Sequence, residues 1–183
     1  MSRAAPSGPR RGWLLGAGVA LGAAALGAGV AWRRIEPGRA ADDAVTLLLG
    51  RTLPDASGAP LALSRFAGRT LVVNFWATWC PPCVEEMPEL SALHAELAPR
   101  GLEMIGIGID SAAKIAEFAR KTPVGYPLVV AGMGGTELGR RFGNESGVLP
   151  FTVLVNRDGG VARRIVGRVD IAALRTMAAS LLG

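Results

Sequence analysis

The chain of 183 residues contains only two cysteines, Cys80 and Cys83, and two prolines separate them. Cysteines at this spacing can form a disulfide and exchange it with the disulfide of another molecule. A helical pattern follows the pair. A thiolate at the start of a helix is stabilised by the helix dipole and by free backbone N–H groups. We therefore expect Cys80 to be the attacking nucleophile and Cys83 to be the more buried thiol that resolves the mixed disulfide.

Two other uses of the pair have less support. A structural disulfide that closes so short a loop removes little chain entropy from the unfolded state, so it stabilises weakly. A structural zinc site needs more ligands than Cys80, Cys83 and the single His94 supply, so no metal site is expected within the chain. His94 follows Cys83 by 11 residues, which is about 16 Å along a straight helix and too far for a base.

The two prolines between the cysteines affect the acidity of Cys80. Neither Pro81 nor Pro82 has a backbone N–H to donate to a thiolate. A pair with a single proline offers one more donor. Our hypothesis is that Cys80 is less strongly acidified than in such a pair, which favours the oxidised form of the pair and hence a reductant.

The segments around the pair alternate between strand and helix patterns. The apolar, β-branched run 71–76 predicts a buried strand, and residues 82–98 predict a helix that Pro88 should kink. Further strands are expected at 102–109, 126–130, 151–156 and 161–166, and further helices at 111–120, 136–142 and 171–182, with a glycine-rich loop at 132–135. This order predicts an α/β fold with a parallel βαβ core and an antiparallel hairpin at one side.

The run NFWATWCPPC, a proline on the following helix and the distal VLPFTVLVNRDGG resemble the thioredoxin superfamily. Within it, the chain is most similar to the TlpA/ResA group of membrane-anchored, extracytoplasmic thiol–disulfide oxidoreductases. The resemblance covers residues 45–183. It implies a thioredoxin-like three-layer fold with a central mixed sheet, and a redox-active Cys80–Cys83 disulfide in place of any cofactor. The chain lacks the GVYGxPE-type segment of the reductase CcmG, so we do not identify it with that protein.

The resemblance also implies a set of substrate-binding residues. Trp79 matches the tryptophan that shields the nucleophile. Pro150 matches the cis-proline that faces the cysteine pair, where the backbone of Leu149 pairs with an extended substrate. Pro82 and Phe151 complete the set. The group more often has threonine directly after the proline, so Phe151 is expected to reshape the groove.

Two further positions concern proton transfer. In cytoplasmic thioredoxins a buried acid occupies the position of Asn74, and an asparagine cannot act as a general base. In ResA-like proteins a glutamate three residues past the second cysteine is assigned that role, and here the position is Glu86. Glu86 lies one helical turn from Cys83, which suits a proton relay. The alternative, a solvated acid beside Glu85 and Glu89, stays open because a sequence does not reveal burial.

The N-terminal region carries an uncharged run at 13–32, bracketed by Trp13 and Trp32. As a helix it is long enough to cross a hydrocarbon layer of roughly 30 Å. The alternative is a signal peptide cleaved near 39–41. We expect a cytoplasmic tail at 1–12, one transmembrane helix or signal sequence at 13–32, a linker at 33–44 and the thioredoxin-like domain at 45–183.

The net charge of +5 comes from this N-terminal region. Six arginines and one glutamate precede residue 42, whereas residues 42–183 carry 14 basic and 14 acidic side chains. The folded part therefore lacks the charge excess of a nucleic-acid-binding domain. Basic residues around an apolar run indicate membrane targeting instead.

These observations predict a protein-disulfide reductase of the bacterial inner membrane, with its catalytic domain in the periplasm or otherwise outside the cytoplasm. The resemblance implies a membrane thiol-electron donor of the DsbD/CcdA type. It also implies exported substrates with cysteine pairs, such as apocytochrome c or oxidase-assembly proteins. The alternatives are a disulfide oxidase, a non-enzymatic soft-metal chaperone, or a peroxiredoxin-like peroxidase. The last would need a PxxxTxxC approach to Cys80, and residues 72–79 contain no proline.

Overall fold

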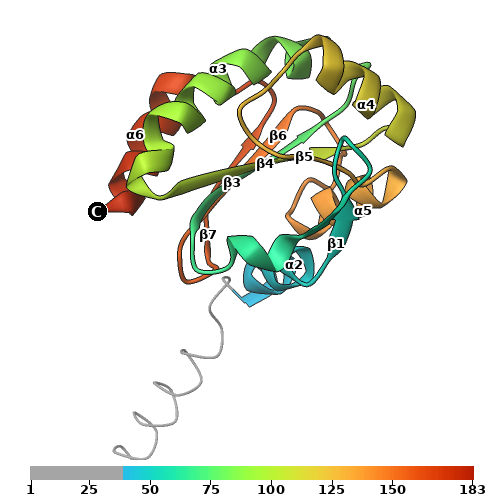
Figure 1. The fold of residues 1–183 in the computed structure, drawn as a ribbon. Coiled ribbons are helices and arrows are strands. Elements are labelled where there is room, and N and C mark those ends of the chain that lie inside the picture. Colours follow the sequence, from blue (N-terminus) through green and yellow to red (C-terminus); the bar gives the residue numbers. More distant parts are fainter. Residues whose placement is uncertain (1–38) are drawn as a thin grey trace, which may run out of the picture. The chain divides into compact units, whose positions relative to one another are not determined.

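The computed structural model describes residues 39–183, with side chains from residue 43 onward. A five-stranded mixed sheet lies between two layers of helices (Figure 1). Its strands, in the spatial order β5-β4-β3-β6-β7, are β5 (Leu128–Val130), β4 (Leu102–Gly108), β3 (Thr70–Trp76), β6 (Phe151–Val155) and β7 (Val161–Val166). Strands β3, β4 and β5 are parallel, whereas β6 runs antiparallel to β3 and β7 antiparallel to β6. The predicted α/β fold with a parallel core and a C-terminal hairpin is confirmed.

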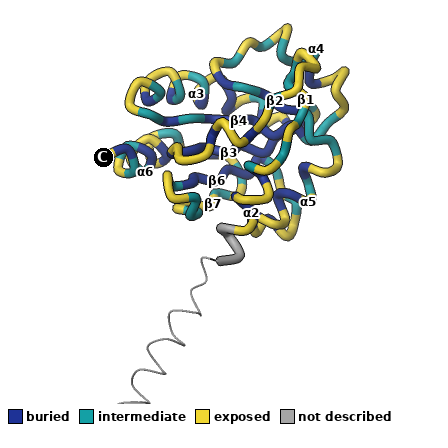
Figure 2. Tube along the Cα trace, turned by 60° about the horizontal axis from the view of Figure 1, so that its bottom comes forward, coloured by how far each residue is buried: buried dark blue, intermediate teal, exposed yellow. Residues whose placement is uncertain are grey.

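Two buried apolar clusters, one on each face of the sheet, define the layers. One face is covered by α3 (Pro81–Leu97), α4 (Ala112–Lys121) and α6 (Ile171–Leu182). The other is covered by α2 (Arg39–Leu49), α5 (Met133–Arg141) and a 3-10 helix (Leu63–Phe66). A second 3-10 helix (Ala98–Arg100) follows α3, and a two-stranded hairpin is made by β1 (Thr52–Pro54) and β2 (Pro60–Ala62). Figure 2 shows that buried residues concentrate in the strands and the inner sides of the helices.

The central strand β3 is buried along all seven residues, because helices cover both faces of the sheet. Alternation along the strand sends Val73 and Phe75 into the cluster beside α2 and α5. Val72 and Trp76 enter the cluster beside α3. Asn74 therefore faces α3 from the middle of a buried strand, where a polar side chain needs hydrogen-bond partners.

The glycine-rich segment before α5 corrects one prediction. Residues 132–135 were expected to form a loop, but α5 begins at Met133, and Gly132, with φ 52°, precedes it. Gly135 is buried inside this helix, where an added Cβ would lie 2.8 Å from Cγ1 of Ile109. Close packing against the sheet therefore overrides the low helix propensity of glycine.

The start of the folded unit also differs from the expectation. Residues 39–44 were assigned to a linker, but α2 begins at Arg39 and the side chain of Ala44 is already buried. Ala44, Val45 and Leu48 form one apolar helix face within the buried cluster that contains Phe66. The β1–β2 hairpin was not predicted. The expected segments 1–12 and 13–32 lie outside the described residues, and no helix within residues 39–183 is long and apolar enough to cross a membrane.

Candidate active site

Cys80 and Cys83 form a disulfide at the start of α3, with their Cα atoms 5.3 Å apart. Cys80 is the residue that precedes the first helical turn, and Pro81 and Pro82 occupy that turn, where a missing N–H removes no helical hydrogen bond. Cys80 is 5% exposed and Cys83 is fully buried. Of the two cysteines, Cys80 is the one with surface open to solvent, and its role as the attacking thiol stays a prediction.

Asp110, which the sequence analysis did not single out, holds the loop that leads to Cys80. The hydroxyl of Thr78 donates a hydrogen bond to its carboxylate, and the N–H of Ser111 donates a second at 2.7 Å. Burial alone would raise the pKa of Asp110, but these hydrogen bonds and the nearby Lys114 outweigh burial and keep the pKa below its ordinary value. Asp110 follows β4, whose carboxyl end lies beside that of β3. The position of Asp110 directly after β4, next to the end of β3, is the signal that could have identified this residue.

An apolar hollow of about 440 Å³ lies beside the nucleophile's neighbour Trp79. Trp79 is 62% exposed and Met133, at the start of α5, is 81% exposed. The hollow is lined by Trp79, Ile109, Asp110, Ser111, Gly132, Met133 and Thr136. Exposed apolar groups next to a reactive sulfur are suited to contact a polypeptide substrate. Met133 was not predicted, because residues 132–135 were expected to be a loop.

Pro150 follows a cis peptide bond with Leu149, so the predicted isomer is confirmed. The next residue begins β6, whose pairing with β3 joins Phe151 to Phe75. This pairing brings Pro150 to the carboxyl end of β3, from which the cysteine loop departs. Leu149 is half-buried and packs against both apolar clusters.

The expectation that Phe151 lines the substrate groove is wrong. Its side chain is fully buried, and its ring centroid lies 5.6 Å from that of Phe75. Alternation along β6 points Phe151 into the cluster beside α2 and α5, and points Thr152 toward α3. Pro82 remains partly exposed beside the cysteines.

Glu86 is fully buried one helical turn beyond Cys83. Its Oε1 accepts a hydrogen bond of 2.9 Å from Nδ2 of Asn74, and its Oε2 accepts one of 3.0 Å from the backbone N–H of Val169. Burial raises the pKa of Glu86 and outweighs these two hydrogen bonds and the charge of Arg168, which lower it. The alternative of a solvated helix acid is therefore wrong for Glu86.

Asn74 connects Glu86 to the strand that follows Pro150. It is paired directly with Thr152 across the sheet, and its Nδ2 donates a hydrogen bond of 3.0 Å to the hydroxyl of Thr152. All three side chains are fully buried. The amide thus supplies hydrogen bonds at the position of the usual buried acid without itself titrating.

Tyr126 and His94 lie outside the hydrogen-bond set of Asn74, Glu86 and Thr152. Burial, followed by the charge of Glu86, raises the pKa of Tyr126, so its hydroxyl stays neutral. Nδ1 of His94 lies 2.9 Å from the carbonyl oxygen of Gly125, which fits the structural role expected for this histidine. Within residues 39–183, no three His, Cys, Asp or Glu side chains are grouped so that they could hold a metal ion.

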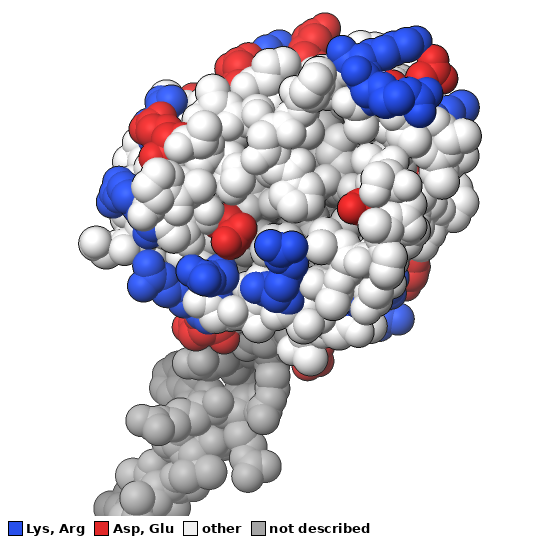
Figure 3. Space-filling view, viewed as in Figure 1, with Lys and Arg blue, Asp and Glu red and all other residues white. Residues whose placement is uncertain are grey.

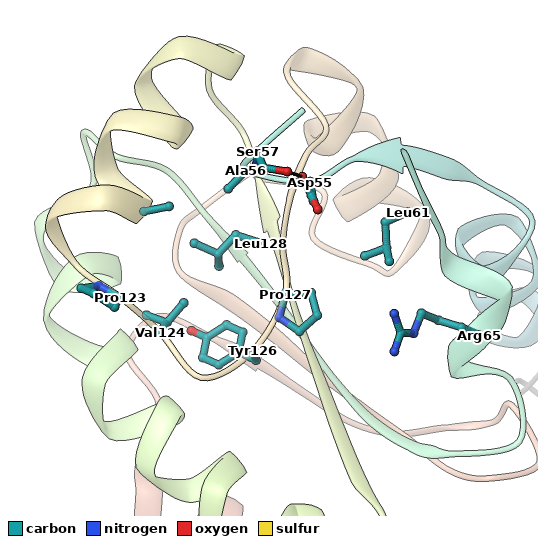
Figure 4. A pocket seen from close by; sticks show the side chains of 11 residues that line it. Asp55, Ala56, Ser57, Leu61, Arg65, Pro123, Val124, Tyr126, Pro127 and Leu128 are labelled. Atoms are coloured by element: carbon teal, nitrogen blue, oxygen red, sulfur yellow. Dashed lines mark hydrogen bonds between the residues drawn. The ribbon is translucent and has the colours of Figure 1, made fainter. Parts of the chain in front are cut away.

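Figure 4 shows a second hollow, of about 460 Å³. Leu61 and Arg65 line one side of it, and Tyr126 and Leu128 line another. It is placed at the amino end of β5, whereas Cys80 follows the carboxyl end of the parallel strand β3. The second hollow is therefore not part of the disulfide site.

The face drawn in Figure 3 carries basic and acidic side chains next to one another, mostly toward its margins. Much of its centre has no charged side chain. This face therefore offers a mainly uncharged surface rather than a continuous basic one.

A thioredoxin-like sheet, a disulfide at the start of the helix after β3 and a cis-proline at the adjacent strand together define a protein of the thioredoxin-like redox class. The sequence profile of the Redoxin family matches residues 37–180, and the chain belongs to this family.

The relatives agree with this class. The chain is 30% identical over 115 residues to a thiol-disulfide oxidoreductase ResA of Bacillus cereus, and the match covers 62% of this chain and 64% of the relative. It is 28% identical over 116 residues to ResA of Bacillus subtilis, and that match covers 63% of each chain. The match thus spans less than two thirds of the length of these relatives. A solved thiol:disulfide interchange protein of the thioredoxin family from Chlorobium tepidum TLS superposes with a TM-score of 0.62 at 27% identity, over 73% of this chain and 93% of that one.

Proposed function

We propose that this protein is an extracytoplasmic thiol–disulfide oxidoreductase that reduces disulfides of exported proteins. The observation that carries the proposal is the Cys80–Cys83 disulfide at the start of α3, with the carboxyl group of Glu86 enclosed one turn beyond it. The thiol-disulfide oxidoreductases named among its relatives support the same chemistry.

In this reaction, two electrons pass from the Cys80–Cys83 pair to the cysteine pair of the substrate. The thiolate of reduced Cys80 attacks one sulfur of a substrate disulfide, which forms a mixed disulfide and releases a substrate thiolate. Glu86 takes the proton of the Cys83 thiol, and the resulting thiolate attacks the sulfur of Cys80. The substrate leaves with both cysteines reduced, and Cys80–Cys83 is oxidised. A membrane thiol-electron donor of the DsbD/CcdA type then returns two electrons.

The exposed apolar surface at Trp79 and Met133 supports docking of a polypeptide beside Cys80. Leu149 and Pro150 supply the backbone edge against which an extended substrate segment pairs. The uncharged run 13–32, with arginines on both sides, supports a single N-terminal membrane anchor and a folded domain outside the cytoplasm. Apocytochrome c and oxidase-assembly proteins are the substrate classes that we propose.

Trapping with a Cys83→Ala variant tests this function. With the resolving thiol removed, the mixed disulfide on Cys80 is expected to persist and to be isolated on a non-reducing gel with its exported substrate attached. The Cys80→Ala/Cys83→Ala double variant is the control and should trap nothing. An absence of trapped partners, together with an absence of disulfide reductase activity in the native protein, would contradict the proposal.

The effect of the two prolines on Cys80 is tested with a Pro81→Gly variant. A glycine restores one N–H at the first helical turn, so the pKa of the Cys80 thiol is expected to fall. Thiolate absorbance measured against pH reports this pKa. Pro99→Gly, in the 3-10 helix Ala98–Arg100, controls for the general effect of exchanging proline for glycine.

An unchanged or higher pKa in Pro81→Gly contradicts the role given to the two prolines. The midpoint potential of the native pair provides a separate check. A value near that of strong oxidants, about −120 mV, would contradict a reductase and would favour the oxidase alternative.

A further inference from the structure

Arg168 lies in the segment 167–170, which joins β7 to α6 (Figure 1). Its side chain forms ion pairs with two glutamates of α3. One guanidinium nitrogen lies 3.2 Å from Oε2 of Glu85, and the other lies 3.1 Å from Oε1 of Glu89. These two glutamates flank Glu86 on α3. A single arginine thus connects the 167–170 segment to two exposed acids of the helix that carries Glu86.

The residues next to Arg168 in the chain contact the site directly. The N–H of Val169 donates its hydrogen bond of 3.0 Å to Oε2 of Glu86. The N–H of Gly167 donates one of 2.8 Å to the carbonyl oxygen of Pro150. The segment therefore covers Glu86 and is attached to the cis-proline at the same time.

We propose that Arg168 is a positioning residue that holds the 167–170 segment over Glu86 and so excludes water from its carboxyl group. The proposal rests on the proton-transfer role given to Glu86 above. Arg168 acts through its two ion pairs and need not touch the substrate or the cysteines. Because the three charged side chains are each about half exposed, the ion pairs add little to global stability, and their loss affects the segment locally.

The groups that face Glu86 come from four segments of the chain. Burial is the largest cause of its raised pKa, and the charge of Glu89 on the same helix raises it further. The hydrogen bonds from Val169 and from Asn74 lower it, as does the charge of Arg168. Tyr126 faces Glu86 from the segment before β5 and stays neutral. Cys83 lies one turn before Glu86 on α3.

Because these contributions oppose one another, the pKa of Glu86 in a variant without Arg168 distinguishes two roles for this residue. If Arg168 acts only as a nearby positive charge, its removal raises the pKa of Glu86. If it holds the segment in place, its removal admits water, and the pKa falls toward its ordinary value, since burial is the largest cause of the shift. Our proposal requires the second result.

Arg168→Gln is the test variant, and Arg175→Gln is a matched control. Arg175, on α6, forms an ion pair of 3.0 Å with Glu96 on α3, and its side chain is similarly exposed. In Arg168→Gln, hydrogen exchange at the Val169 amide is expected to be on the order of tenfold faster than in the control. Exchange at Val73, in the buried strand β3, should be the same in both variants.

Two further measurements complete the test. The carboxyl carbon resonance of Glu86, titrated in the oxidised protein, should show a lower pKa in Arg168→Gln than in the native chain. Arg168→Lys keeps the charge but replaces the two-nitrogen fork with one ammonium group, so it is expected to restore part of the protection at Val169. Unchanged exchange at Val169, a raised pKa of Glu86, or no restoration by lysine would overturn the proposal. None of these readouts requires disulfide-exchange activity, so a failure here is distinct from a failure of the proposed function.

Discussion

A Cys80→Ser variant is expected to reduce protein disulfides at least about a thousandfold more slowly than the native protein. A serine hydroxyl does not ionise near neutral pH and cannot form a mixed disulfide. The variant should remain folded, because the disulfide closes a very short loop and contributes little to stability. Turbidity of reduced insulin, measured with pre-reduced protein, provides the rate.

Cys83→Ser is the matched control for this experiment. It retains the Cys80 thiol and should perform the first attack in a stoichiometric burst, after which it accumulates as a mixed disulfide. The single free thiol of each variant has different surroundings, since Cys80 is 5% exposed and Cys83 is fully buried. Steady activity in Cys80→Ser, or a burst in that variant instead of in Cys83→Ser, would reverse the assigned roles.

A Glu86→Gln variant is expected to slow resolution of the mixed disulfide by about a hundredfold near neutral pH. The effect should shrink at high pH, where hydroxide can take the proton of the resolving thiol in place of a local base. Glutamine has nearly the shape of glutamate and can accept the hydrogen bond from Val169. Oδ1 of Asn74, which accepts no hydrogen bond from any described residue, is available to the new amide after a flip of the Asn74 side chain. The rate is measured by stopped flow with a pre-formed mixed disulfide.

Stability against pH provides a second readout of the same variant. Because folding raises the pKa of Glu86 above its ordinary 4.5, the native state binds the proton more tightly than the unfolded state does. The contribution of Glu86 to the free energy of unfolding therefore falls as the pH rises from 4.5 through the raised pKa. Glu86→Gln should lack this fall. Glu96 is an exposed glutamate on the same helix, so the Glu96→Gln control should keep the native dependence of both rate and stability on pH. If Glu86→Gln also kept the native rate profile, the relay would be contradicted.

Local patterns were sufficient for much of the fold. The apolar run before Cys80 predicted β3, and the helix expected at 111–120 is α4, where the hydroxyl of Ser111 accepts a hydrogen bond from the N–H of Lys114. The cis bond before Pro150 came from the family resemblance. In each case the information lies within a few neighbouring residues or in a motif.

Other features depend on contacts between distant segments. The local sequence pattern did not reveal these features. The helix at Met133 forms although glycines surround its start, because Gly135 packs closely against Ile109. Phe151 was assigned to the groove from its place after the proline. The pairing of β6 with β3 turns its side chain to the opposite face.

By itself, the sequence of this protein determined the cysteine pair and the strand and helix that present it, and it predicted the order in which Cys80 and Cys83 attack. Only the tertiary structure decided that Glu86 is buried, because the segment that covers it follows 83 residues later along the chain. Likewise, the contact between Thr78 and Asp110 joins residues 32 positions apart. A local sequence pattern specifies the backbone and the chemical groups of its own segment. Burial, and with it the pKa of a carboxyl group, depends on which distant segment packs over it.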